Sequence, residues 1–226
     1  MDAFQKAWVF ARCGAVAAAL LLLCAKPAAA SPAEDFIQTY VTQGLAILND
    51  KTLPHAEKHM RFEALLEPMT DMRRVALYTL GPAAKTLPSE KLEAFVAAFH
   101  ELQMSLYERE LWRVGQLKIE NTVERSRGDV IVQGFRVDAS GYRSVNADEI
   151  DFRVLNPSDK PVLVDLCVLG VWVAVSQKAQ YSEFLEQRGA TIDKLTAKIR
   201  NRASKMNRYL AAGEEEPPRV RKARTR

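Results

Sequence analysis

The spacing of apolar residues changes twice along this chain, and this change limits the folds that it can adopt. Over residues 32–112 apolar residues recur every three or four positions, which indicates amphipathic helices. Over residues 115–175 they alternate or run together between turn signals such as Ser140-Gly141, which indicates β-strands. Helical spacing returns over residues 178–212. Because short connections join antiparallel neighbours, the sequence predicts an α+β fold with a four-stranded antiparallel sheet.

Local signals place the ends of these elements. We expect helices over residues 32–50, 54–69, 70–81, 89–112, 178–189 and 191–212, and strands over residues 115–126, 129–138, 146–156 and 161–175. Thr70 or Asp71 is suited to cap the start of the third helix, and Gly81 is suited to end it. Thr191 has the same capping role before the last helix.

The stretch VLVDLCVLGVWVAV, residues 162–175, is unusually apolar for a strand of a half-covered sheet. If it is one strand, counting by twos places apolar residues on both of its faces. Val162, Val164, Leu166, Val168 and Trp172 lie on one face, and Leu163, Cys167, Leu169, Val171 and Val173 lie on the other. Both faces then need cover from water. Either helices cover both sides of the sheet, or one face lines an internal apolar cavity.

The two ends of the chain differ from its centre. Residues 1–30 have a positive start, an apolar stretch and small residues before Ser31, which predicts a cleaved secretory signal peptide. Residues 31–212 then form the folded domain, and residues 213–226 are expected to be a disordered basic tail. The net charge of +4 for the whole chain gives no case for nucleic-acid binding.

Residues suited to catalysis are few. The chain has three histidines, and two of them, His55 and His59, are four residues apart on an expected helix. They could hold a metal ion, but the H-E-x-x-H motif is absent and a solvated helix surface is the simpler interpretation. Asp165 is either a structural carboxylate bonded to an arginine or to backbone donors, or an acid inside a cavity. We expect Cys167, the only thiol left after signal cleavage, to be a small buried apolar residue.

The order of these elements and several local strings resemble the MlaC-type periplasmic phospholipid-binding proteins, also called the toluene-tolerance auxiliary family of ABC transporters. The similar strings are AILNDKTLPHAEKHMRFEALL (46–66), TDMRRVALYTLG with Asp71, Leu80 and Gly81, PSEKLEAFVAAFHELQMSLYEREL with Phe95, Phe99 and Tyr107, and VDLCVLGVWVAVSQKAQYSEFLEQRG with Asp165, Gly170 and Tyr181. Together they span about residues 34–200. The chain departs from the family where it has LGPAAK in place of an aromatic pair, Trp172 in place of a serine, and Lys178 in place of an arginine.

The resemblance implies an NTF2-like fold, in which a curved sheet and helices enclose a deep apolar pocket. It also implies a carrier in the periplasm of a Gram-negative bacterium, without a cofactor and without enzymatic activity. Such a carrier moves phospholipid between an outer-membrane lipoprotein complex and an inner-membrane ABC transporter with an MCE-domain subunit, and so maintains the lipid asymmetry of the outer membrane. Two alternatives stay open, a carrier of another lipid such as a hopanoid, and an NTF2-like enzyme that acts on a small hydrophobic substrate.

The candidate pocket residues are apolar side chains from the expected helices and strands. They are Leu80, Phe95, Phe99, Leu102, Tyr107, Val132, Phe152, Val164, Val168 and Trp172. Trp172 is bulky where relatives have a small residue, so we expect it to limit the space for cargo. The expected exit route is a gap between the helix over residues 89–112 and the sheet.

Overall fold

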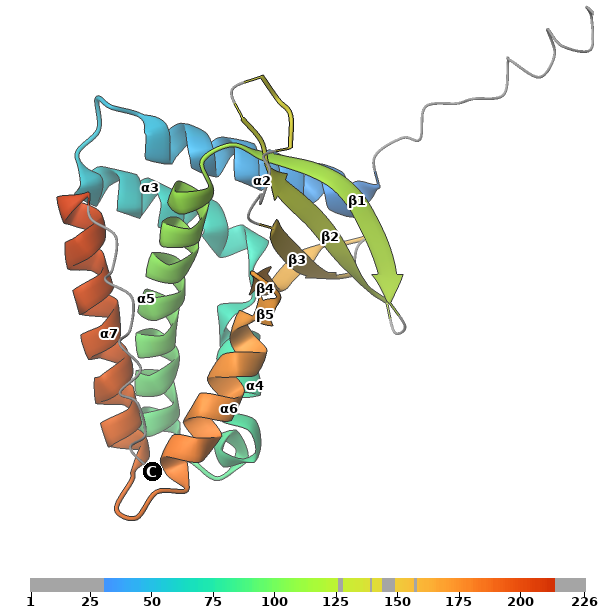
Figure 1. Cartoon of the computed structure of the whole chain (residues 1–226). Helices are drawn as coiled ribbons and strands as arrows, with labels where there is room; N and C mark the ends of the chain where they lie inside the picture. Colours follow the sequence, from blue (N-terminus) through green and yellow to red (C-terminus); the bar gives the residue numbers. More distant parts are fainter. Residues whose placement is uncertain (1–30, 126–127, 139, 144–148, 157, 214–226) are drawn as a thin grey trace, which may run out of the picture. The chain divides into compact units, whose positions relative to one another are not determined.

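The computed structural model describes residues 31–125, 128–138, 140–143, 149–156 and 158–213 (Figure 1). The helices are α2 (Pro32–Asn49), α3 (His55–Leu66), η1 (Glu67–Met69), α4 (Met72–Leu80), η2 (Gly81–Lys85), α5 (Ser89–Val114), α6 (Val173–Leu185) and α7 (Ile192–Ala212). The strands are β1 (Leu117–Arg125), β2 (Asp129–Arg136), β3 (Glu149–Leu155), β4 (Val162–Val168) and β5 (Val171–Trp172). The predicted signal peptide and residues 214–226 of the predicted tail lie outside the described residues.

The predicted caps are present. The Asp71 carboxylate accepts a hydrogen bond from the Arg74 N–H at 2.9 Å and caps α4, which ends at Gly81 with a φ of 59°. The Thr191 hydroxyl accepts from the Lys194 N–H at 3.3 Å and caps α7. No helix of the described residues is both long and apolar enough to cross a membrane.

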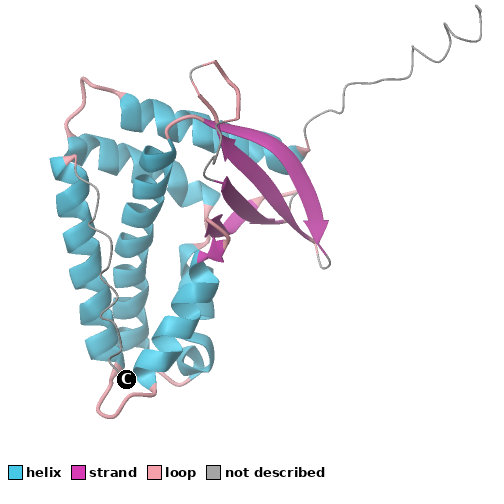
Figure 2. Cartoon of the chain, viewed as in Figure 1, coloured by secondary structure: helices cyan, strands magenta, loops and turns pink. Residues whose placement is uncertain are grey.

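The sheet is antiparallel throughout and has one strand more than predicted (Figure 2). Its five described strands follow one another in chain order, from β1 at one edge to β5 at the other. The predicted mixed fold of helices and antiparallel sheet is therefore confirmed, whereas the prediction of four strands was wrong. The likeness to NTF2-type folds stays a prediction.

The stretch over residues 162–175 is not one strand. β4 ends at Val168, and Leu169 and Gly170 then form a tight turn with φ values of 51° and 77°. Positive φ at both central residues is the requirement of a type I′ turn, which is common in two-residue hairpins, and glycine adopts it without strain. The chain returns as β5 and enters α6 at Val173, five residues before the predicted start of that helix.

The turn and a bulge in β4 change which side chains share a face. Trp172 lies opposite Cys167 in the sheet, while Val168 lies opposite Val171, so Trp172 and Val168 are on different faces. The register also shifts within β4, so that Leu163 and Leu166 lie opposite Val154 and Phe152 of β3. The prediction that Leu163 and Leu166 lie on opposite faces of the strand was therefore wrong, because side chains no longer alternate regularly across a bulge.

Helices cover the inner face of the sheet, which is the face that carries Phe152 and Leu166. α2 lies along β1, while α5 and α7 stand side by side (Figure 1). Lys91 pairs with Asp193 near the start of α5 and α7, and Ser105 donates to Asn207 further along both helices, so the two helices run parallel. The main core fills the space between α5, its neighbouring helices and the inner face of the sheet.

Candidate functional site

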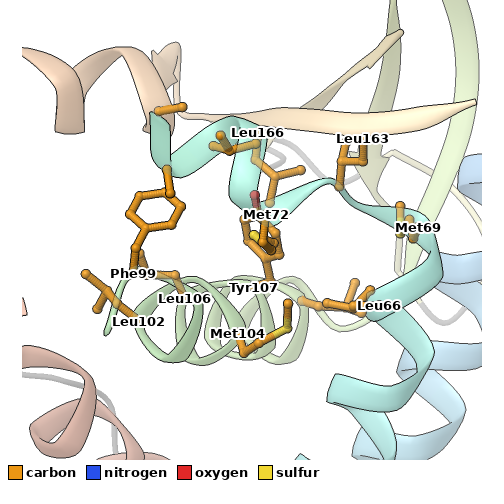
Figure 3. Packing of buried hydrophobic residues seen from close by; sticks show 14 of the residues in the cluster. Leu66, Met69, Met72, Phe99, Leu102, Met104, Leu106, Tyr107, Leu163 and Leu166 are labelled. Atoms are coloured by element: carbon orange, nitrogen blue, oxygen red, sulfur yellow. The ribbon is translucent and has the colours of Figure 1, made fainter. Parts of the chain in front are cut away.

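An apolar hollow lies between the inner face of the sheet and three helices, and we call it the inner hollow. Its walls come from α2, α3, η1, α5, β3 and β4. They are Tyr40, Val41, Phe62, Leu66, Met69, Tyr107, Glu110, Leu111, Ile150, Phe152, Leu163 and Leu166. Figure 3 shows Leu163 and Leu166 of β4 above Tyr107 of α5, with Leu66 and Met69 at one side. Glu110 is the only charged residue among these walls.

The inner hollow is small. Its free volume is about 40 Å³, which is room for a few water molecules. Pockets that hold a drug-sized ligand have about 300–1,000 Å³. Close packing of α2 contributes to this small volume, since a Cβ atom at Gly44 would lie 2.8 Å from the Leu111 side chain and 3.1 Å from the Phe62 ring. A large apolar ligand therefore requires the helices and the sheet to move apart.

A second hollow, which we call the outer hollow, shares three of its wall residues with the inner hollow. Tyr107, Glu110 and Leu166 line both hollows. The outer hollow has a free volume of about 230 Å³, and its other walls are Leu106, Arg109, Val168, Val171, Val173, Ser176, Gln177, Gln180 and Arg202. Val171 is 56% exposed, so this hollow reaches the surface. The shared residues thus lie between a small apolar space and a larger, more polar one.

Two polar groups lie at the boundary between the hollows. They are the Glu110 carboxylate, which is paired with arginines, and the Tyr107 phenol. The Glu110 carboxylate accepts hydrogen bonds from Arg109 Nε at 2.9 Å and from Arg113 Nε at 3.1 Å. Burial raises the pKa of the Tyr107 phenol, with a smaller contribution from the charge of Asp165. The phenol is therefore neutral at physiological pH and can act as a hydrogen-bond donor.

The ten candidate pocket residues occupy several places. Tyr107 and Phe152 line the inner hollow, and Tyr107 and Val168 line the outer one. Val164 faces a separate space of about 240 Å³ beside α4 and α6. Buried residues that line neither hollow are Leu80, Phe95, Phe99, Leu102 and Val132. Trp172 is half-buried and also lines neither hollow.

Sequence reasoning missed most of the inner walls. Tyr40 and Val41 belong to the apolar stripe of α2, and Phe62 and Leu66 to that of α3, but no residue of either stripe was among the predicted pocket residues. The pattern of β3 contained a usable signal, because Ile150 alternates with Phe152 and therefore shares its face. Glu110 gave no signal, since a glutamate on a helix is usually exposed.

Comparison with known proteins identifies the family. A family model described as MlaC protein matches residues 38–201. The chain belongs to the MlaC family. The fold is also similar to that of the phospholipid-binding protein from Ralstonia solanacearum, solved in complex with a phospholipid. That match has a TM-score of 0.62 and 18% identity, and it covers 77% of this chain and 98% of the other. No curated protein matches this chain.

The three places where we expected this MlaC family member to depart from the family pattern lie away from the inner hollow. Lys178 of α6 places its ammonium group 4.5 Å from the centre of the Tyr78 ring, which is a cation–π contact. Trp172 occupies the edge strand β5. The segment after Leu80 forms the short helix η2. None of these residues is a wall of the inner hollow.

All three histidines of this MlaC family member pair with glutamates where α3 and η1 meet α5. His55 Nε2 lies 3.0 Å and His59 Nδ1 2.5 Å from the two carboxylate oxygens of Glu108, whose side chain is 3% exposed. On the same interface His100 Nε2 lies 2.6 Å from Glu67 Oε1. The interpretation of His55 and His59 as a solvated surface was therefore wrong. These pairs hold α3, which supplies two walls of the inner hollow, against α5.

We expect the Glu108 pair to make stability depend on pH. The hydrogen bond to Glu108 raises the pKa of His59 above its usual value. A raised pKa in the folded state gives stability that is complete below pH 6.5 and is lost as pH rises through the folded pKa. The free energy of unfolding, measured by urea titration, should therefore fall between pH 6 and pH 8.

Glu108→Gln should lower the free energy of unfolding by about 1–3 kcal/mol at pH 6, and it should flatten the fall between pH 6 and pH 8. Glu101→Gln, at an exposed position of the same helix, is the matched control. If the Glu108 variant kept the full pH dependence, His59 would not be its source.

Asp165 is a structural carboxylate in this MlaC family member. Its Oδ1 accepts hydrogen bonds from the N–H groups of Leu166 at 2.9 Å and Ala174 at 2.8 Å, and the Val175 N–H also bonds to it. The N-cap residue of α6, Trp172, has no side-chain cap. Asp165 therefore caps α6 from the neighbouring strand, in agreement with one of its two predicted interpretations. It is not a wall of the inner hollow, but it lines the space of about 240 Å³ that Val164 also faces.

Proposed function

We propose that this chain is a periplasmic lipid carrier that shields the acyl chains of a phospholipid in the inner hollow. The observation that carries this proposal is an almost wholly apolar space between helices and sheet, which shares three wall residues with a more polar hollow. An amphiphile has the same two-part character. Membership of the MlaC family and a fold shared with a phospholipid-binding protein support the proposal.

The energetics of acyl chains favour a carrier that exchanges lipid between apolar surroundings. Hiding two chains of about 16 carbons from water is worth roughly 25 kcal/mol, at about 0.8 kcal/mol per CH₂ group. This exceeds the practical limit of non-covalent affinity, about 18–21 kcal/mol, so release into water would be negligible. Transfer from a bilayer or a partner protein to the hollow exchanges one apolar medium for another, and its free energy change is close to zero.

Loading requires the inner hollow to widen. The proposed route runs between α5 and the sheet, past Tyr107 and Glu110 of α5 and Leu166 of β4. Widening there connects the two hollows. Binding of a partner supplies the free energy for this movement, because the closed packing is favourable when the hollow is empty.

The proposed cargo contacts combine observed walls with the residues expected from the sequence. Tyr107, Phe152 and Val168 already line one of the two hollows. The remaining candidates contact acyl chains only after the hollow has widened. They are Leu80, Phe95, Phe99, Leu102, Val132, Val164 and Trp172. Each is an apolar side chain in or beside the core, and the core must separate there when the hollow widens.

The proposed partners are an outer-membrane lipoprotein complex and an inner-membrane ABC transporter with an MCE-domain subunit. The carrier moves phospholipid between them and so maintains the lipid asymmetry of the outer membrane. It performs no chemical reaction on its cargo. Next to the outer hollow the surface carries exposed apolar residues, Leu169 at 65% and Val175 at 45%, which suit docking to such a partner.

Lipid extraction tests the function. The protein purified from cells should yield phospholipid in organic extract, identified by mass spectrometry, and should accelerate phospholipid transfer between donor and acceptor vesicles. Recovery of a hopanoid or another lipid would show that this lipid, and not phospholipid, is the cargo. Turnover of a small hydrophobic substrate would favour the enzyme hypothesis. A chain recovered without lipid and unable to take any from vesicles would contradict a carrier function.

A further inference from the structure

The outward face of α7 is strongly basic. Leu195, Ile199 and Met206 are among the residues that α7 buries against the core. The opposite face carries exposed residues three or four positions apart, which form one straight row because an α-helix has 3.6 residues per turn. We call it the basic row, and its members are Lys194, Lys198, Asn201, Lys205 and Arg208. At 1.5 Å per residue the row is about 20 Å long.

The contacts of the three lysines leave their charges without a counter-ion. The Lys194 ammonium group donates to a backbone carbonyl oxygen at 2.7 Å. The ammonium group of Lys198 lies 4.7 Å from the centre of the Phe184 ring. That of Lys205 lies 5.6 Å from the centre of the Tyr209 ring. Carbonyl groups and aromatic rings attract a cation but carry no net negative charge, so the row keeps its positive charge.

The nearby acids do not neutralise the row either. Asp193 is the only acid in the sequence of α7, and its carboxylate pairs with Lys91 of α5 at 2.7 Å. Arg208 lines a hollow that also has Glu63 and Glu101 as walls, but among the described residues it forms no ion pair. The exposed side of α7 therefore presents charge of a single sign, whereas both signs are usually mixed on the surface of a soluble protein.

A straight row of cations matches a flat anionic surface. A bilayer that contains anionic phospholipid spreads its charge over a plane, so all the cations of the row can lie close to it at once. Ala197 and Ser204, which are exposed beside the row, are small and allow the helix to approach closely. The row has no apolar member that could insert between lipids. Attraction between charges therefore dominates, without burial of α7 in the bilayer.

We propose that the basic row of α7 binds the surface of an anionic phospholipid bilayer. α7 then lies parallel to the membrane plane. In Figure 1 α7 and the sheet lie on opposite sides of α5, and α7 supplies no wall of the inner hollow. The row thus holds the protein at a membrane while the inner hollow stays away from the bilayer. This inference goes beyond the proposed carrier function and does not depend on the identity of the cargo.

Sedimentation with vesicles tests the attraction between charges. The wild-type chain should bind vesicles of phosphatidylcholine with about 30% phosphatidylglycerol at least about 50-fold more tightly than vesicles of phosphatidylcholine alone. The reason is that each cation close to an anionic surface contributes about fivefold to affinity. Raising the NaCl concentration from about 0.05 M to about 0.5 M should remove most of this binding, because salt screens exposed charges. Equal binding to both kinds of vesicle would overturn the proposal.

Two fourfold variants with the same net charge separate the row from general basicity. The row variant carries Lys194→Gln, Lys198→Gln, Lys205→Gln and Arg208→Gln. The control variant carries substitutions at exposed cations of other elements, namely Lys51→Gln, Arg74→Gln, Lys85→Gln and Lys160→Gln. The row variant should bind anionic vesicles at least about 50-fold more weakly than the wild-type chain, and the control variant within about threefold of it.

The cations of residues 218–226, PRVRKARTR, are present in both variants. A row variant with a normal circular dichroism spectrum and wild-type affinity for anionic vesicles would therefore overturn the role of α7. If the row instead bound an acidic protein, the wild-type chain would not bind anionic vesicles, and the row variant would slow phospholipid transfer only when that protein was present. This result would exclude the bilayer.

Loading from neutral vesicles distinguishes the basic row from the carrier function. The row variant should take up phospholipid from phosphatidylcholine vesicles as well as the wild-type chain does, because none of the substituted residues lines the inner hollow. If neither chain took up lipid, the carrier function would be contradicted, and binding to anionic vesicles would still decide the role of the row. If only the row variant failed to load, the row would belong to the cargo site, which would overturn the proposal.

Discussion

Leu163→Asp is expected to reduce phospholipid binding by at least about 100-fold. Leu163 is 2% exposed and is a wall of the inner hollow on β4. An ionised carboxylate at this position would lose its hydration each time an acyl chain entered, which costs several kcal/mol, and each 1.4 kcal/mol is about tenfold in affinity. Binding is measured as phospholipid retained after incubation with vesicles and gel filtration.

Two further variants separate loss of binding from loss of fold. Val123→Asp places the same charge on β1, on the outer face of the sheet, where Val123 is 44% exposed, and it should bind normally. Leu163→Ala makes the inner hollow larger without adding charge and should also bind. A Leu163→Asp chain with a normal circular dichroism spectrum and normal lipid binding would exclude the inner hollow as the site of the acyl chains.

Asp165→Ala is expected to lower the free energy of unfolding by about 2–4 kcal/mol. The substitution leaves backbone N–H groups of Leu166 and Ala174 without their acceptor in a buried place and removes the cap of α6. The loss is measured by urea denaturation at pH 7. A loss below about 0.5 kcal/mol would contradict the capping role.

Asp165→Asn should retain stability and function. Burial raises the pKa of Asp165, so the charged form is penalised in the folded state, and an asparagine oxygen accepts the same bonds without this penalty. The free energy of unfolding at pH 7 should lie within about 1 kcal/mol of the wild-type value. Lipid transfer should be unchanged, whereas a general acid or base at this position would require the carboxyl group. Loss of all activity in a stable Asp165→Asn chain would favour the enzyme hypothesis.

The parts of the fold that the sequence could predict depend on interactions between residues that are close together in the sequence. Caps such as Asp71 and Thr191 act within one helical turn. The spacing of apolar residues, every 3.6 residues in a helix and every second residue in a strand, shows which face of each element is buried. The hairpin at Leu169 could not be predicted in the same way. A leucine with positive φ is uncommon, and Val171 and Trp172 continue the apolar pattern as if the strand had not turned.

The site was harder to predict than the fold because α5 is buried on almost all sides. Every residue from 102 to 108 is buried, so no polar stripe marks which side faces the sheet and which faces α7. Phe95 and Phe99 fit a pocket by size, yet Phe95 packs edge-on against the Tyr181 ring of α6. The side of a fully buried helix that faces a cavity is decided by its tertiary neighbours, which apolar periodicity does not report.

The most direct test of the central claim uses a phospholipid with a diazirine group on one acyl chain. After loading from vesicles and irradiation of the wild-type chain, labelled peptides are mapped by mass spectrometry. We expect labels on walls of the inner hollow, among them Phe152, Leu163 and Tyr107. Labels confined to the outer face of the sheet, at Val123 or Ile131, or no label on a loaded chain, would contradict it.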